Sequence, residues 1–139
     1  MLELINALKQ IPDSKILQVE PLCFLYKNIE FEISLDDNVD QIYIISCVIY
    51  KNNEMNYEDV TKYMATSIAI GGILYNSCFE YDLDLNHENG TYKYVLYEEL
   101  SFHFSDLIEN PSDYLVEMVL EDMIGKKELF WQRLELALS

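Results

Sequence analysis

Apolar and polar residues alternate without interruption over residues 29–35. The apolar positions share one side of an extended chain and the polar positions share the other: Ile29, Phe31, Ile33 and Leu35 against Glu30, Glu32 and Ser34. This period of two predicts a strand with one face on a core. Residues 41–50 are almost continuously apolar, which predicts a strand buried on both faces. Residues 16–26 are also extended in pattern, but Pro21 cannot donate a ladder hydrogen bond and predicts an edge strand or a bend.

A second pair of strands is predicted on either side of Asn89-Gly90. Residues 79–85 alternate between apolar and acidic side chains, as expected for a strand with one solvated face. Asn-Gly is the strongest signal for a two-residue hairpin turn, because both central residues of that turn need a positive φ. The register that follows sets apolar residues against apolar residues: Leu85 opposite Tyr94 and Leu83 opposite Leu96.

Helical spacing appears in three segments. In the first, apolar residues recur at intervals of three and four and stop before Pro12: Leu4, Ile5, Leu8 and Ile11. The second is expected to begin at Asn56, whose side chain suits a helix cap with the acidic Asp59 three residues on, and to run to about Tyr75. The third begins at residues 110–113, where a cap residue precedes a proline and an acid, and runs to about Leu138.

The order of these elements is α-β-β-β-α-β-β-α. It predicts an α+β fold, an antiparallel sheet with three helices, in a single domain over residues 1–139. The second helix carries two apolar stripes, and a helix that is apolar on most sides is buried on most sides. One stripe contains Val60 and Met64. The other is expected to form a homodimer interface: Tyr63, Thr66, Ile70 and Ile73. Gly71-Gly72 within this helix predicts a close-packing point or a helix stop.

The charge of the chain narrows its possible partners. The sequence has 9 Lys and Arg against 25 Asp and Glu, a formal net charge of −16 at pH 7. Such a field repels phosphate backbones and anionic lipids, so we expect neither nucleic acid nor a membrane as a partner. It suits a basic partner, or a protein that must stay soluble while it exposes apolar surface.

Other bulk features point to the cytoplasm. No stretch is apolar over a length that spans a bilayer, and the N-terminus lacks the basic region of a secretory signal. The three cysteines, Cys23, Cys47 and Cys78, lie far apart inside apolar runs. We expect them to be reduced, buried thiols.

Few residues offer catalytic chemistry. His87 lies beside the predicted turn and His103 lies between two phenylalanines, and both are expected to be structural or surface residues. A nucleophile pair of Cys78 with His103 would lack any flanking signature. Residues 82–86 have the spacing of a calcium loop, but its glycine position holds His87 and its last ligand position holds Lys93. We therefore expect no enzyme activity, no metal and no cofactor.

Three stretches carry a resemblance to a known family. The first is residues 21–33, with Pro21-Leu22-Cys23-Phe24-Leu25-Tyr26 followed by Ile29-Glu30-Phe31-Glu32-Ile33. The second runs from Phe79 to Tyr97, and the third is Leu129-Phe130-Trp131-Gln132-Arg133-Leu134-Glu135. With the element order, size and acidity, they resemble the class I chaperones of bacterial type III secretion. In that family they look like the first hairpin, the second hairpin and the end of the last helix. The polar connection at residues 51–56 is shorter than in many relatives.

The resemblance implies a bacterial cytoplasmic homodimer that binds a secreted effector and keeps an N-terminal segment of it extended. It implies no catalytic residues and no cofactor. Apolar patches on the first helix and early strands would bind the effector, with these candidates: Leu4, Ile5, Leu8, Leu17, Val19, Leu22 and Phe24. If the first helix packs beside the strand that Pro21 interrupts, the two would border an apolar groove with unpaired backbone groups.

An alternative from another class is an acidic immunity protein that neutralises a basic toxin. Its contact surface would be made of exposed Asp, Glu and Tyr side chains. The net charge of −16 is as compatible with an immunity protein as with a chaperone. The two stripes of the second helix favour the chaperone.

Overall fold

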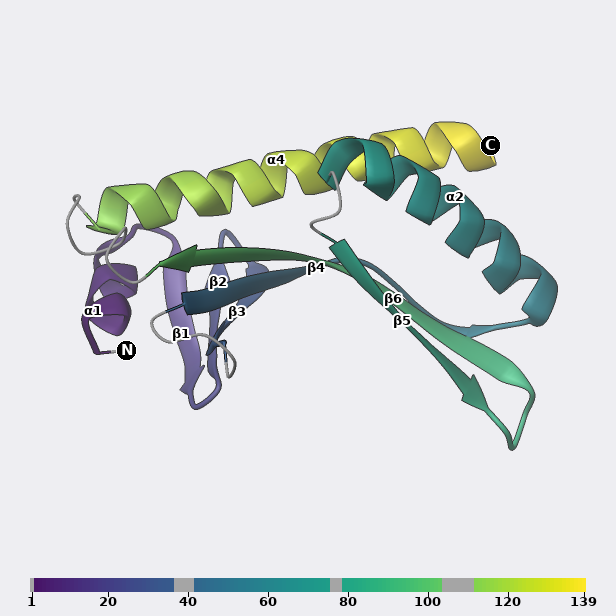
Figure 1. Cartoon of the computed structure of the whole chain (residues 1–139), viewed down its shortest axis with the longest axis horizontal. Coiled ribbons are helices and arrows are strands. Elements are labelled where there is room, and N and C mark those ends of the chain that lie inside the picture. Colours follow the sequence, from purple (N-terminus) through teal and green to yellow (C-terminus); the bar gives the residue numbers. More distant parts are fainter. Residues whose placement is uncertain (1, 37–41, 76–78, 104–111) are drawn as a thin grey trace. The chain divides into compact units, whose positions relative to one another are not determined.

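The computed structural model of the chain describes residues 2–36, 42–75, 79–103 and 112–139 (Figure 1). Its elements follow in this order: α1 (Leu2–Gln10), β1 (Ser14–Val19), β2 (Leu22–Tyr26), β3 (Ile29–Leu35), β4 (Ile42–Met55), α2 (Tyr57–Tyr75), β5 (Phe79–Asn86), β6 (Thr91–His103) and α4 (Ser112–Leu138). The strands are hydrogen-bonded in the order β1-β2-β3-β4-β6-β5. The α+β class with an antiparallel sheet is confirmed.

The predicted element order lacks one strand. The segment 16–26 is two strands rather than one interrupted strand, and β1 and β2 pair with each other, with Val19 opposite Leu22. Glu20 and Pro21 form the connection between them, where Pro21 has no ladder hydrogen bond to donate. The expected pairing of β2 with β3 is confirmed, with Phe24 opposite Phe31.

The predicted strand end at residue 50 is also wrong, because β4 continues to Met55. One face of β4 is buried, but Val48 on the other face is 43% exposed, so the strand is not buried on both faces. The start of α2 is as predicted. The Asn56 side chain accepts a hydrogen bond from the Asp59 amide at 2.8 Å, which caps the helix.

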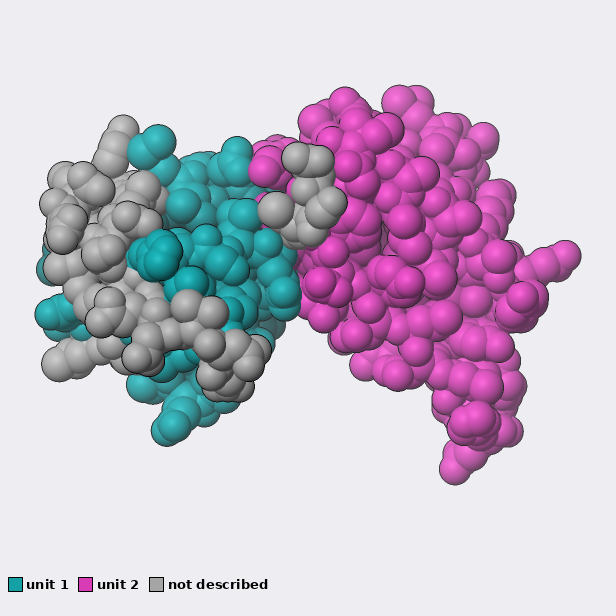
Figure 2. All heavy atoms as spheres, in the orientation of Figure 1, with its two compact units in different colours: residues 1–47, 99–124 teal, residues 48–98, 125–139 magenta. Residues whose placement is uncertain are grey.

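Contacts within the chain divide it into two compact units (Figure 2). Unit 1 comprises residues 1–47 and 99–124, and unit 2 comprises residues 48–98 and 125–139. The strands β4 and β6 and the helix α4 contribute residues to both units. The single domain expected from the chain length therefore stays a prediction.

The core of unit 1 lies between α1, the strands β1–β4 and the first part of α4. The apolar side of α1 is buried in it, together with the inward residues of β2 and β3 and Leu120 of α4. Phe24 and Phe31 stack at its centre with ring centroids 5.6 Å apart. Of the two cysteines that the structure describes, Cys47 is buried as expected but Cys23 is only half-buried, and neither forms a disulfide. Cys78 and the expected helix start at Asn110 and Pro111 lie outside the described residues.

A polar cluster ties β2 to α4 within unit 1. The Glu121 carboxylate accepts a hydrogen bond from the Tyr26 hydroxyl at 2.6 Å and pairs with the Lys27 ammonium. The Lys27 and Tyr26 donors hold the pKa of the Glu121 carboxyl below its usual range. Burial, and then the bond to Glu121, raises the pKa of Tyr26 to about 12, so its hydroxyl keeps its proton and remains a donor at neutral pH.

Helix α2 covers the sheet of unit 2 with its first predicted stripe. Its fully buried positions are Val60, Ser67, Gly71 and Tyr75. A Cβ at Gly71 would lie 3.4 Å from the Phe79 ring, which is an ordinary van der Waals distance, and nothing lies within 4 Å of a Cβ at Gly72. The close-packing interpretation of Gly71-Gly72 therefore stays a prediction. The helix continues to Tyr75, so the alternative of a helix stop at Gly71-Gly72 is wrong.

The β5–β6 hairpin exists, but its predicted register is wrong by two residues. Leu83 lies opposite Tyr94 and Leu85 lies opposite Tyr92. The loop holds four residues between Asn86 and Thr91, rather than two. The Asn86 side chain accepts the Glu88 amide at 3.0 Å, and the Gly90 amide donates to the Asn86 carbonyl at 2.9 Å. A shift by two keeps each apolar residue on its predicted face, because strand side chains alternate with a period of two.

A buried hydrogen bond joins α2 to β6 in unit 2. The hydroxyls of Ser67 and Tyr94 are 2.7 Å apart, and both residues are 0% exposed. The Ser67 hydroxyl also donates a hydrogen bond to the Met64 carbonyl, and this bond uses the one proton of that hydroxyl. The Tyr94 hydroxyl is therefore the donor in the bond to Ser67.

This arrangement predicts unequal effects of two substitutions. Ser67→Ala removes the acceptor of a buried O–H, and we expect it to lower the free energy of unfolding by about 2 kcal/mol. Tyr94→Phe leaves the Ser67 hydroxyl donating to the Met64 carbonyl, so it should lower the free energy of unfolding by only about 1 kcal/mol. Urea denaturation measures both, with Thr61→Ala as the control, since the exposed Thr61 hydroxyl bonds only to its own helix. Equal losses from the two substitutions would contradict the assigned donor.

Candidate interaction surfaces

The seven residues expected to bind an effector do not share one surface. Five of them are buried in the core of unit 1: Leu4, Ile5, Leu8, Leu22 and Phe24. Helix α1 does pack beside β1, where the Ser14 hydroxyl bonds to the Ile11 carbonyl at 2.7 Å. Its apolar side, however, covers the core. The predicted groove along α1 is therefore filled by the chain's own side chains.

The other two candidates, Leu17 and Val19, lie on the surface of β1. They are 47% and 56% exposed, and β1 is the end strand of the sheet within the described residues. The register of β1 shifts between Ile16 and Gln18, so Leu17 has no partner position on β2. We call Leu17 and Val19 the β1 edge surface.

Three of the four candidates for the dimer interface are half-buried. Tyr63 and Ile70 pack against the core of unit 2, and Thr66 bonds to the carbonyl of Lys62 at 2.9 Å. Ile73 differs, because 76% of its surface is exposed. It lies among small exposed residues of the same helix: Ala65, Ala69 and Gly72. We call these three residues and Ile73 the α2 outer face.

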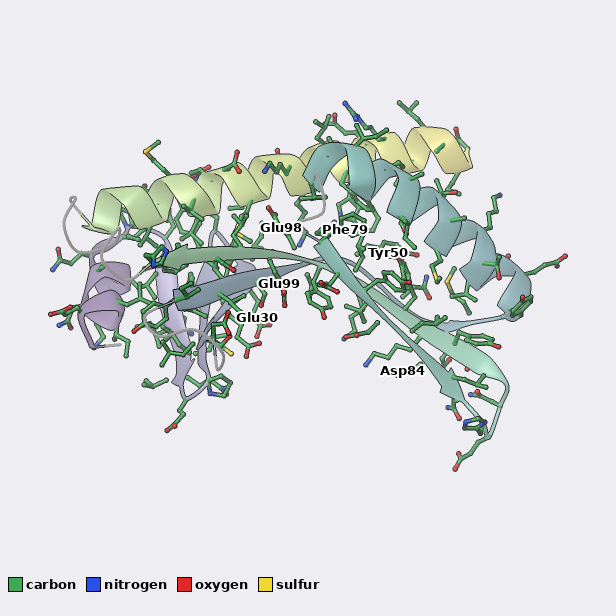
Figure 3. The ribbon with its side chains drawn as sticks, viewed as in Figure 1. Glu30, Tyr50, Phe79, Asp84, Glu98 and Glu99 are labelled. Carbon is green, nitrogen blue, oxygen red and sulfur yellow. The ribbon has the colours of Figure 1, made fainter. Side chains whose placement is uncertain are left out.

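A surface that the sequence did not single out follows β5, the other end strand of the sheet. On one face it exposes Tyr81, Leu83 and Leu85, each more than a third accessible. The other face carries the exposed acids Glu80, Asp82 and Asp84. Only Asp84, labelled in Figure 3, has a basic residue opposite it on β6, namely Lys93. The alternation of residues 79–85 predicts one core face and one solvent face, but β5 exposes side chains on both faces.

The chemistry-bearing residues remain dispersed in the structure. His87 and His103 are exposed, and the considered partner Cys78 lies outside the described residues. Among the residues that the structure describes, no group of three or more His, Cys, Asp and Glu side chains could hold a metal ion. No described helix is long and apolar enough to cross a membrane. Glu98 is a buried acid on β6, which its strand position did not predict.

Comparison with known proteins adds no relative. The chain matches no family model, no curated protein and no solved structure.

Proposed function

We propose that this chain binds an extended segment of another protein and keeps it unfolded, as the class I type III secretion chaperones that it resembles do for their effectors. The observation that carries the proposal is the β1 edge surface. An end strand that exposes Leu17 and Val19 offers two kinds of contact at once: backbone groups for an added strand, and apolar side chains for its residues.

The energetics of such a complex suit an apolar, extended partner. Burying a large aliphatic side chain completely contributes about 1.5–3 kcal/mol, so the part-exposed Leu17 and Val19 together contribute about 2 kcal/mol, with backbone pairing added. Ordering a disordered segment offsets part of this gain. The net charge of −16 keeps a protein with exposed apolar strands soluble.

The acidic face of β5 favours a second candidate. Glu80, Asp82 and Asp84 are exposed on one strand face, and such a row of carboxylates would suit an immunity protein that inhibits a basic toxin. The two functions differ in what drives binding, because apolar burial is weakly sensitive to salt whereas attraction between exposed charges is screened.

The test uses the product of a neighbouring gene as the partner, because secretion chaperones and immunity proteins are both encoded beside their targets. Affinity is measured by isothermal titration calorimetry from low to high salt, for the wild type and for Leu17→Asp with Val19→Asp. We expect about a tenfold or greater loss from the double substitution and a modest loss with salt. A control with the same added charge is Met118→Asp with Leu136→Asp, two exposed positions on α4.

Steep loss of binding with salt, together with normal binding by the double variant, would favour the inhibitor and reject the chaperone mechanism. Equal losses in the double variant and its control would show that the added charge acts by itself, and would also reject the β1 edge surface.

A further inference from the structure

Unit 2 contains an aromatic pocket of about 250 Å³ that neither proposed function uses. Three elements line it: β4 contributes Tyr50, α2 contributes Tyr63, and the last turns of α4 contribute Trp131, Leu134, Glu135 and Leu138. Tyr50, labelled in Figure 3, is almost fully buried, while Trp131 is 37% exposed. The pocket therefore has a buried aromatic residue at its base and an accessible indole at its side.

The rings are held in place by the protein itself. The Tyr50 ring lies 6.1 Å from that of Tyr63 at an interplanar angle of 13°, and 5.3 Å from that of Trp131 at 53°. The Trp131 indole N–H donates to the Ile49 carbonyl at 2.9 Å. The Tyr50 hydroxyl accepts a hydrogen bond from Asn52 at 3.2 Å. These bonds use the polar edges of the rings and orient them before any ligand arrives, which lowers the entropic cost of binding.

The electrostatics of the pocket select a cation. Aromatic faces carry the negative part of the ring quadrupole and attract cations within about 6 Å. The Glu135 carboxylate lies at the rim, and none of the described basic side chains pairs with it. The aromatic faces and the Glu135 carboxylate thus both favour positive charge at this place.

Of the common organic cations, guanidinium fits these features best. It is planar, it stacks on aromatic faces, and it can pair with a carboxylate through two parallel N–H bonds. An ammonium is a compact and strongly hydrated point charge, which loses more hydration in an apolar pocket. The apolar Leu134 and Leu138 suit the methylene part of an arginine side chain.

We propose that this pocket binds an arginine side chain of a protein partner, with its guanidinium group against the Tyr63 and Trp131 rings and paired with Glu135. The site does not depend on whether that partner is an effector or a toxin.

Trp131 is the one tryptophan of the chain, so its fluorescence and its indole N–H resonance report directly on the pocket. The probes are N-acetyl-arginine amide and its neutral isostere N-acetyl-citrulline amide, titrated into the full chain. We expect the arginine probe to shift the Trp131 signals saturably and the citrulline probe to bind about tenfold more weakly, because it lacks both the cation–π attraction and the ion pair. Equal binding of the two probes, or no shift with the arginine probe, overturns the proposal.

Variants separate the contributions of the pocket residues. Glu135→Gln should weaken the arginine probe about threefold through loss of a partly exposed ion pair, and Tyr63→Leu about fivefold through loss of a ring face. Glu128→Gln is the matched control, an exposed acid on α4 outside the pocket, and should bind normally. If choline or N-acetyl-lysine amide binds more tightly than the arginine probe, the pocket selects another cation and the arginine assignment is wrong. Equal effects of the Glu135 and Glu128 substitutions would likewise reject the assigned ion pair.

Discussion

Leu8→Asp is expected to unfold unit 1, whereas Leu17→Asp is expected to leave it folded. Both residues were candidates for the same binding surface, but Leu8 is 0% exposed inside the core and Leu17 is 47% exposed on β1. Truncating a buried leucine costs about 2–5 kcal/mol, and an unpaired carboxylate in its place adds several kcal/mol more. The sum is comparable to the whole stability of a small domain, about 5–15 kcal/mol.

Circular dichroism and urea denaturation of the two variants measure this difference. Leu17→Asp should change the free energy of unfolding by less than about 1 kcal/mol, the usual range for a surface position. A folded Leu8→Asp protein with near-wild-type stability would mean that α1 leaves the core easily, and that the predicted groove can open. The result therefore decides whether α1 is a structural element or part of a binding site.

The second large effect concerns self-association through α2. Ile73 is 76% exposed on the α2 outer face, and the small residues beside it allow close approach of another helix. We expect the wild type to form a symmetric dimer through this face, in which each Ile73 is buried. Because the substitution occurs twice in such a dimer, Ile73→Glu should weaken association on the order of a hundredfold or more.

Sedimentation velocity over a range of concentrations measures the association. Ile70→Glu is a poorer test than Ile73→Glu, because Ile70 packs against the core of unit 2 and its replacement would also destabilise the fold. Leu136→Glu is the control, since Leu136 is equally exposed but lies on α4. A wild type that stays monomeric at every concentration, or equal weakening by both substitutions, would reject the α2 interface.

Local features predicted the elements well. The alternation at residues 29–35 became β3, and Asn56 caps α2. These features depend on residues a few positions apart, so their pattern is visible in the sequence. Predictions were wrong where two local conformations compete. Pro21 is compatible with an interrupted strand or with a turn between two strands, and the structure has the turn. At Asn89-Gly90 a four-residue loop, in which Asn86 accepts a hydrogen bond, is present instead of the two-residue turn.

By itself, the sequence determined the α+β class, the apolar faces of most strands and helices, and the net charge of −16. The tertiary structure decided which apolar residues remain outside: Leu8 is in the core, while Leu17, Ile73 and the apolar residues of β5 are exposed. It also brought Tyr50, Tyr63 and Trp131 into one pocket. An apolar pattern identifies the face that an element tends to bury, but whether another element covers that face depends on segments far away in the chain.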